Sequence, residues 1–243
     1  MNKRIGIFIL VISIFILFAI NYSWIDSYVI KEISKEESSV LRVVDGDTIK
    51  IENETVRLLG INTPEKGEKY YQEAKDFLEV LILNKTIQLE SGKENRDKYY
   101  RKLRYIFVDG KNINLELVKN GFANPYFPAG KDKYSNEFYE AWNQCLKENI
   151  KFCERSANKC TTCIELKEFD YRNGIINLNN NCSYDCNLKN WIITNEGRKR
   201  IILNETINAE KEITITTEGI WTNTGDSLFL RDKEGKLILW RNY

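Results

Sequence analysis

The hydrophobic pattern changes twice along the chain and divides it into three parts. Residues 5–20 form an uncharged, strongly apolar run behind Lys3 and Arg4. Residues 39–150 combine short runs of β-branched and aromatic residues with segments whose apolar positions recur at helical spacing. Beyond residue 163 only short strand patterns follow. We therefore expect an N-terminal hydrophobic segment followed by two folded domains.

The apolar run is typical of an export signal, because two cations precede it and the positive-inside rule keeps those cations in the cytoplasm. A helix of this length spans roughly 24 Å, short of a ~30 Å hydrocarbon core, and Tyr22 and Trp24 extend it into the interface. No clear small-x-small cleavage motif follows, so we favour a signal anchor over a cleaved peptide within residues 1–25. Residues 26–38 would be a tether, and the protein membrane-anchored with extracytoplasmic domains, or secreted.

The pattern over residues 39–150 predicts an α+β domain built on a small barrel. Turn signals such as Asp45-Gly46 and Asp109-Gly110 separate the strands, and we expect Ser135 to be the N-cap of the last helix. The expected strands lie at 40–51, 55–61, 86–91 and 101–108, and the expected helices at 70–85, 113–123 and 135–150.

Residues 163–243 predict an all-β domain. Short strands separated by Asn, Gly and Asp turns, at spacings of about ten residues, are typical of a β-sandwich. The expected strands lie at 163–171, 174–179, 190–195, 199–204, 211–217, 227–232 and 236–242. Residues 151–162 have no hydrophobic periodicity and contain cysteines, so we place the domain junction there.

Composition restricts the chemistry. Lys and Arg number 36 against 35 Asp and Glu, a formal net charge of +1, so any polyanion binding must come from locally placed cations. The chain has no histidine, which excludes Ser-His-Asp and Cys-His catalysis and His-ligated zinc. Acid–base work therefore falls to carboxylates, Tyr, Lys or Arg.

Three polar motifs of the first domain carry candidate chemistry: Asp45-Gly46-Asp47-Thr48, Arg57 with Asn62-Thr63-Pro64-Glu65, and Asp97-Lys98-Tyr99-Tyr100-Arg101. Taken singly, each is more often a turn or a solvated face. Together, guanidinium groups suit a phosphodiester anion, and carboxylate and carbonyl oxygens suit a hard cation.

In this order the motifs resemble the thermonuclease (staphylococcal nuclease-like) family. The resemblance rests on VVDGDTIKI, RLLGINTPE, QEAKDFL, DKYYRKLRYIFVDGKNINLELVKNGFA and SNEFYEAWNQCLKEN, which make up most of residues 39–150. It implies an oligonucleotide-binding, five-stranded barrel with three helices. It also implies a Ca²⁺-dependent nuclease that hydrolyses DNA and RNA with low sequence specificity, with single strands as the preferred partners.

The resemblance assigns roles to individual residues. Arg57 and Arg101 would grip the phosphate, and Glu65 would orient or deprotonate the attacking water. The same resemblance gives the ion its ligands, with Asp45 close by but not on the ion. These ligands are Asp47, the side chain of Asn62 and the carbonyl of Thr63.

Two positions depart from the family pattern. Asn62 stands where the family usually has Asp, which should lower Ca²⁺ affinity, and Tyr100 stands where it usually has Gly. Because Gly permits a positive φ and Tyr resists it, we expect a reshaped loop before Arg101. Catalysis should survive, since Arg57, Glu65 and Arg101 remain. The alternatives are a non-catalytic nucleic-acid-binding module and a cell-surface scaffold protein.

Aromatic residues beside cations indicate where bases would stack. Tyr99, Tyr126 and Phe127 are the candidate stacking residues, and Lys98 is placed to meet a terminal phosphate. For Tyr126 and Phe127, packing at the domain edge is an equally good interpretation.

Six cysteines cluster around the domain junction: Cys145, Cys153, Cys160, Cys163, Cys182 and Cys186. An even number behind an export signal favours disulfides, although the last four also fit a four-thiolate zinc pattern. We expect Cys145 to pair with Cys153 and the other four to crosslink the junction and the sandwich. Together these bonds would fix the relative position of the two domains.

The C-terminal segment resembles the lamin-tail domain, an immunoglobulin-like sandwich. The matching stretches are CIELKEFDYRNG, CSYDCNLKNWIITNEGRKRIIL and TNTGDSLFLRDKEGKLI. Such a domain would target or tether the enzyme to a partner that the sequence does not identify. We expect Trp191 in its core, and we interpret Arg198-Lys199-Arg200 as a charged, solvated turn rather than a nucleic-acid contact.

Overall fold

The computed structural model describes residues 11–17 and 36–243, and Val11–Leu17 are helical. Most of the predicted signal anchor, and the predicted tether up to residue 35, fall outside the described residues and stay predictions, whereas residues 36–38, which were assigned to the tether, belong to the first barrel strand. Within the described ranges, no helix has both the length and the apolar character needed to cross a bilayer.

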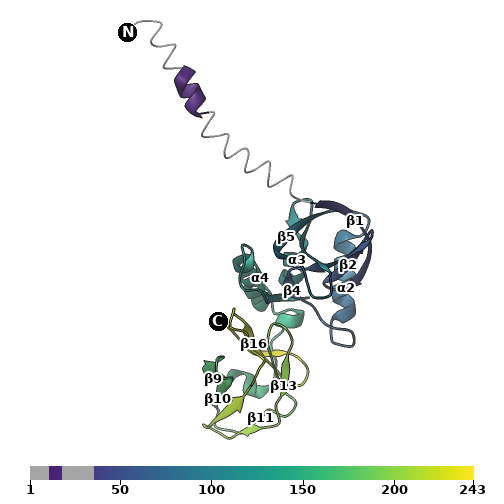
Figure 1. The fold of residues 1–243 in the computed structure, drawn as a ribbon. Helices are drawn as coiled ribbons and strands as arrows, with labels where there is room; N and C mark the ends of the chain where they lie inside the picture. The colour runs from purple at the N-terminus through teal and green to yellow at the C-terminus, as the bar shows by residue number, and fades with distance from the viewer. Residues whose placement is uncertain (1–10, 18–35) are drawn as a thin grey trace.

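The first domain is a closed barrel (Figure 1). Antiparallel pairing gives the strand order β3-β2-β1-β5-β6, and a parallel pairing of β3 with β6 closes the sheet. The strands are β1 (Glu36–Asp45), β2 (Thr48–Ile51), β3 (Glu54–Leu58), β5 (Thr86–Arg96) and β6 (Lys102–Val108), with short β7 (Lys111–Asn112) at the end of β6. Beside the barrel, β4 (Gly60–Asn62) pairs with β8 (Asn124–Tyr126). The predicted five-stranded barrel is confirmed.

The three predicted helices are present as α2 (Tyr71–Ile82), α3 (Ile113–Lys119) and α4 (Ser135–Glu148). Helix α3 is shorter than predicted because Gly121, at a φ of 71°, reverses the chain soon after its last turn. Ser135 is not the N-cap of α4 as predicted. The residue before the helix is Tyr134, and Ser135 instead accepts a hydrogen bond from the Asp132 amide at 2.7 Å.

The C-terminal domain is all-β, as predicted. Its main sheets have the orders β15-β10-β9 and β13-β12-β16-β17, and one buried core contains residues of both, including Leu178, Ile193 and Leu230. Trp191 is 2% exposed in that core, as expected. The strands are β9 (Ile164–Asp170), β10 (Ile175–Asn180), β11 (Cys186–Asn187), β12 (Ile192–Thr194), β13 (Arg200–Ile202), β14 (Thr206–Ile207), β15 (Glu212–Thr216), β16 (Ser227–Arg231) and β17 (Leu237–Asn242). The two-residue strands β11 and β14, which pair with each other, were not predicted.

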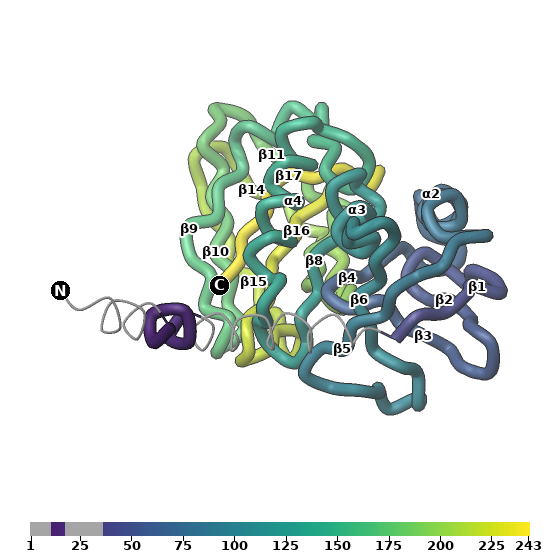
Figure 2. Tube along the Cα trace, turned by 90° about the horizontal axis from the view of Figure 1, so that it is seen from above, coloured from purple at the N-terminus to yellow at the C-terminus, as the bar shows by residue number. Residues whose placement is uncertain are grey.

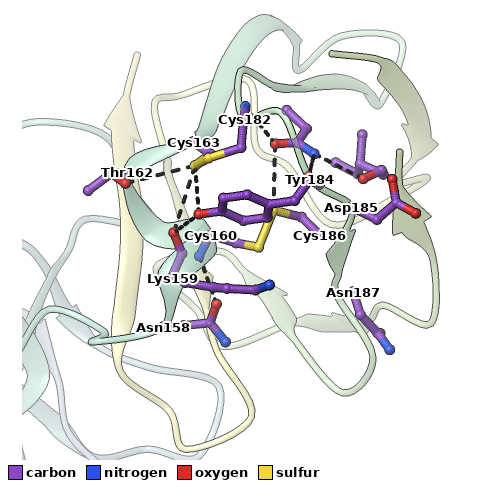
Figure 3. Close-up of a disulfide and its surroundings, with 12 residues drawn as sticks. Asn158, Lys159, Cys160, Thr162, Cys163, Cys182, Tyr184, Asp185, Cys186 and Asn187 are labelled. Atoms are coloured by element: carbon purple, nitrogen blue, oxygen red, sulfur yellow. Dashed lines mark hydrogen bonds between the residues drawn. A yellow bond between two sulfur atoms is a disulfide. The ribbon is translucent and has the colours of Figure 1, made fainter. Parts of the chain in front are cut away.

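All six cysteines form disulfides, which confirms that prediction and rules out the zinc alternative. The pairs are Cys145–Cys153, Cys160–Cys186 and Cys163–Cys182. Figure 3 shows the last two together, with the Tyr184 hydroxyl donating to the Lys159 carbonyl at 2.9 Å. The first bond belongs to the barrel core and the other two to the C-terminal core. The expectation that disulfides fix the two domains relative to each other is therefore wrong.

Noncovalent packing joins the domains instead. Trp142 of α4 packs edge-to-face on Phe229 of β16 at 5.5 Å and on Trp240 of β17 at 6.3 Å. Phe229 is buried within the same cluster as the barrel core. In Figures 1 and 2, α4 accordingly lies against the C-terminal strands. This apolar contact holds the C-terminal domain on the side of the barrel where β8 lies.

Candidate active site

The hairpin between β1 and β2 carries two neighbouring carboxylates. A Cβ atom at Gly46 would lie 2.9 Å from the Thr63 side chain and 3.0 Å from that of Ala74, so only glycine lets the hairpin pack this closely. The Asp47 amide donates to Asp45 Oδ1 at 3.2 Å. Burial, followed by the charge of Asp47, raises the pKa of Asp45. The hairpin therefore concentrates negative charge at one point of the barrel.

Asp47 ties this hairpin to the segment after β4. Its Oδ2 accepts hydrogen bonds from the amide and hydroxyl of Thr63 at 3.0 and 2.9 Å, and it forms an ion pair with Arg57 Nη2 at 3.0 Å. Its Oδ1 accepts from the Thr48 hydroxyl at 3.1 Å. The Asp47 carboxylate thus joins the motif of the β1–β2 hairpin to the motif that contains Arg57 and Thr63.

Arg57, on β3, is held by several acceptors. Nη1 donates to the Leu58 carbonyl at 2.8 Å, and Nη2 donates to the Ile61 carbonyl at 3.0 Å and to Asn62 Oδ1 at 3.2 Å. The side chain is only 12% exposed. Its guanidinium plane is therefore fixed before any ligand arrives.

Arg101, the residue before β6, reaches the same region. Its Nε donates to Asp97 Oδ2 at 2.7 Å, and its Nη1 donates to the Thr48 hydroxyl at 3.4 Å. Burial acts to raise the pKa of Asp97, but hydrogen bonds from Arg101 lower it overall. Within the described ranges, Arg101 Nη2 has no hydrogen-bond partner. That nitrogen can donate to a ligand without breaking a bond to the protein.

The loop before Arg101 contains the positive φ that Tyr100 was expected to resist. Tyr100 adopts a φ of 63°, the left-handed conformation that a glycine takes easily. Its amide donates to the Asp97 carbonyl at 2.9 Å, and its carbonyl accepts from Arg96 at 2.7 Å. The hydrogen bonds of the turn hold Tyr100 in a conformation that its side chain disfavours.

Glu65 lies apart from this cluster, on the exposed turn that follows Thr63. Its amide donates to Glu68 Oε2 at 2.8 Å. No hydrogen bond to its carboxylate occurs in the part of the chain that the structure describes, and its charge acts on Arg198 of the C-terminal domain. The carboxylate is therefore available for water or a ligand.

A cavity of about 410 Å³ opens beside the arginines. Arg57 and Arg101 line it together with the predicted binding residues Lys98, Tyr99 and Tyr126. The Tyr99 ring is 67% exposed and has Lys98 Nζ 5.0 Å and Arg101 Cζ 5.4 Å from its centre. The predicted catalytic and binding arginines and aromatics thus meet at one hollow.

Tyr126 and Phe127 also line this cavity, but they differ in exposure. Phe127 is 7% exposed and packs edge-to-face on Phe138 at 5.6 Å, which supports the packing interpretation for that residue. Tyr126 is half-buried on the cavity wall, and burial raises its pKa. Tyr126 therefore stays a candidate for base contact.

The C-terminal domain reaches this site, which the sequence analysis did not predict. The backbone carbonyl of Glu196 accepts hydrogen bonds from the side-chain amides of Asn62 and Asn124, each at 3.1 Å. Arg198 forms an ion pair with Glu68 and is partly buried, so the prediction of a solvated turn is wrong for this residue. In the sequence, only the unusual Asn at position 62 could have indicated this contact, because an amide can donate a hydrogen bond to a carbonyl and a carboxylate cannot.

The predicted ligand atoms on Asp45, Asp47 and Thr63 are oxygens, which suit a hard cation such as Ca²⁺. Asp45 and Asp47 repel each other, and a cation between them would relieve that repulsion. In this conformation Asn62 Oδ1 faces Arg57 rather than open space. Over the described residues, no group of three or more acidic or cysteine side chains is arranged to hold a metal. The fit to a cation therefore rests on the two carboxylates and the Thr63 segment.

Arg57 and Arg101 are both held by hydrogen bonds next to the carboxylates of the β1–β2 hairpin. This arrangement on a closed barrel is typical of a protein that binds phosphodiesters. The family model described as staphylococcal nuclease homologue matches residues 55–152. The thermonuclease of Staphylococcus intermedius is 33% identical over 134 residues, which cover 51% of this chain and 80% of that protein. The thermonuclease of Staphylococcus hyicus is 32% identical over 129 residues, covering 48% and 76%. Endonuclease YncB of Bacillus subtilis (strain 168) is 37% identical over 109 residues, covering 40% and 52%.

The chain therefore belongs to the staphylococcal nuclease, or thermonuclease, family. The match to the family model ends at residue 152, so the C-terminal domain lies outside it.

Proposed function

We propose that this protein is an extracytoplasmic, Ca²⁺-dependent nuclease that hydrolyses DNA and RNA with low sequence specificity and prefers single strands. Its membership of a family of nucleases makes it a phosphodiester hydrolase and disfavours the non-catalytic and scaffold alternatives. The apolar run behind Lys3 and Arg4 supports a location outside the cytoplasm.

One observation carries the proposal: Arg57 and Arg101 are linked through Asp47 and Thr48 at the edge of one cavity. A phosphodiester gains negative charge as a nucleophile adds to phosphorus, so fixed cations stabilise the transition state more than the ground state. A guanidinium also stays charged at any working pH. This pair is therefore suited to phosphoryl chemistry without histidine.

Each residue then has a defined task. Arg101 donates its Nη2 to a phosphate oxygen, while Asp97 holds the side chain in place. Arg57 presents a fixed positive charge to the same group. Glu65, which is exposed on its turn, accepts a proton from or orients the attacking water. Bound at Asp45, Asp47 and the Thr63 segment, Ca²⁺ would supply further positive charge to the phosphate.

The cavity favours single strands. Its aromatic wall offers ring faces, and stacking on a ring face is tolerant of base identity. A base must leave its duplex partner to enter such a hollow, which costs energy that an unpaired strand does not spend. Low sequence specificity follows from the same feature.

Cleavage of labelled single-stranded DNA and RNA, with Ca²⁺ and with chelator, tests the proposal. Arg101→Ala should lower the rate by about 10² to 10³, by analogy with the loss of one donor to a developing oxyanion. Arg172→Ala, which removes an exposed arginine far along the chain, is the matched control. Cleavage that persists in chelator, or that is the same in Arg101→Ala as in the parent, would refute the assignment.

The C-terminal domain needs a role of its own. We propose that it is a lamin-tail-like sandwich that tethers the enzyme to a partner, while the N-terminal segment holds the chain at the membrane. Its all-β core and its packing on α4 are compatible with a fixed carrier domain. Fractionation of cells expressing the full chain, with and without alkaline extraction, tests the membrane location. Recovery in the cytosolic fraction would contradict it.

A further inference from the structure

A second cavity, of about 310 Å³, lies between the two domains. Its cationic lining comprises Lys69 from the barrel side and Arg198, Arg200, Arg231 and Lys233 from the C-terminal domain. Its acidic lining is limited, within the described chain, to Glu68 and Glu234. In a protein of almost zero net charge, this cleft is a local concentration of positive charge.

Two guanidinium groups converge inside the cleft. Arg198 Cζ and Arg231 Cζ lie 5.2 and 5.4 Å from the ring centre of Phe152. Arg231 Nη1 donates to the Phe152 carbonyl at 2.8 Å, whereas Arg198 is ion-paired with Glu68. The pKa of both arginines is lowered to about 10, mainly by burial, and the charge of Arg198 contributes to the shift of Arg231. Like charges held this close to each other favour an anion between or beside them.

Arg198 also has an unused donor. Its Nε is buried and, among the residues that the structure describes, finds no hydrogen-bond partner. A buried donor without an acceptor is destabilising, and a ligand oxygen bound to it would remove that cost. The Phe152 ring, in contrast, is already contacted by two guanidinium groups, so it has little face left for a base. The cleft therefore suits phosphate oxygens rather than nucleobases.

The cleft adjoins the active site through the loop Asn195–Lys199. A Cβ atom on Gly197 would lie 3.3 Å from the Tyr126 ring, which lines the first cavity, while Asn195 and Arg198 line the second. Arg198 also feels the charges of Glu65 and Asp47. One loop thus separates the two cavities and places the Arg198 guanidinium within electrostatic range of Glu65 and Asp47.

We propose that this interdomain cleft binds a backbone phosphate of the polynucleotide strand whose scissile phosphate lies at Arg57 and Arg101. The C-terminal domain thereby extends the substrate-binding surface of the nuclease. Arg198 and Arg231 form the inner wall, and the exposed Arg200 and Lys233 meet the strand at the rim. The choice of ligand rests on the proposed function, whereas the anion site rests on the cleft alone.

The test compares two double variants of the full chain. Arg200→Ala with Lys233→Ala removes the rim cations, and Arg172→Ala with Lys189→Ala removes two exposed cations outside both cavities. Fluorescence anisotropy in chelator measures binding of a dinucleotide and of a single strand of about 16 nucleotides. A gel run afterwards confirms that the strand is intact.

The rim variant should lose affinity for the long strand relative to the dinucleotide, and the control variant should not. The slope of log affinity against log salt should become shallower by about 1.4 for two lost phosphate contacts. Equal effects in both double variants, or an equal loss for the dinucleotide, would overturn the proposal.

A calorimetric titration with inorganic phosphate distinguishes the other source of the anion. Tight binding of inorganic phosphate by the parent, lost in the rim variant without any change for the long strand, would assign the cleft to the free ion and overturn strand binding. These binding measurements do not require cleavage. An inactive enzyme would therefore refute the proposed function without affecting the test of the cleft.

Discussion

The side-chain amide of Asn62 donates to the backbone carbonyl of Glu196 over 3.1 Å, across the boundary between the two domains. A carboxylate at position 62 would place two acceptors against each other, since neither it nor a carbonyl can donate. The amide is therefore the group that this domain arrangement requires. Asn62 links the predicted metal site to the C-terminal domain.

Asn62→Asp should raise Ca²⁺ affinity and lower stability at the same time. The added charge next to the predicted ion site should shift affinity by roughly tenfold or more. The lost bond to Glu196 should cost about 1–3 kcal/mol in the free energy of unfolding. Calorimetry with Ca²⁺ and urea unfolding measure the two effects.

Asn124→Asp is the matched control, because Asn124 also donates to Glu196 but is no candidate ligand. It should lower stability without raising Ca²⁺ affinity. If Asn62→Asp binds Ca²⁺ no better than the parent, Asn62 does not contact the ion.

Stability should fall as pH rises from about 4.5 to 7. Burial of the Glu196 carboxyl raises its pKa from the ordinary 4.5 to about 7, with the charge of Asp226 adding to the shift and hydrogen bonds from Ser227 and Tyr139 opposing it. The folded protein therefore holds a proton that the unfolded chain has lost. The associated stability is present below pH 4.5 and disappears as pH passes 7, a change on the order of 2–3 kcal/mol.

Glu196→Gln should make the profile shallower in this window and stabilise the protein at pH 7, because an amide has no proton to lose. Urea unfolding over the pH series measures this. Glu205→Gln, which alters an exposed carboxylate of the same domain, should keep the parental slope. A parental slope in Glu196→Gln would show that another group titrates.

Tyr100→Gly should stabilise the protein by about 1 kcal/mol, because glycine adopts the φ of 63° without steric cost. The Tyr100 side chain is 81% exposed, so its removal sacrifices little packing. Tyr100→Ala also deletes the ring but retains Cβ, and it should gain nothing. Equal stabilisation by both substitutions in urea unfolding would place the effect in the ring rather than in the backbone.

Asp97→Asn should lower kcat by roughly 10- to 100-fold, because a donor would replace the oxygen that holds Arg101 Nε and the guanidinium would lose its alignment. In an Arg101→Ala background the same substitution should cost nothing further, since there is no guanidinium left to orient. Initial-rate kinetics of the single and double variants test this coupling. Additive losses would show that Asp97 acts independently of Arg101.

The local sequence pattern was sufficient to predict most strands and helices of the barrel domain and the residues of the arginine cluster. Strand-like alternation surrounds Val43 and Ile49, and helical spacing surrounds Leu78 and Trp142. These patterns show which side chains face the core, and they can be recognised within a window of a few residues. The motifs around Asp47 and Asp97 also sit in tight turns, so their internal hydrogen bonds form between near neighbours in sequence. These features follow from the sequence by itself.

The contact between the domains was decided only by tertiary structure. Glu196 contacts Asn62 although 134 residues separate them in sequence. No local sequence pattern around either residue predicts this contact. Arg198 looks like a solvated cation in sequence, because burial of a charge depends on which surface folds over it rather than on its neighbours. The packing of Trp142 on Phe229 brings that surface over the barrel, and it thereby places Arg198 beside the active site.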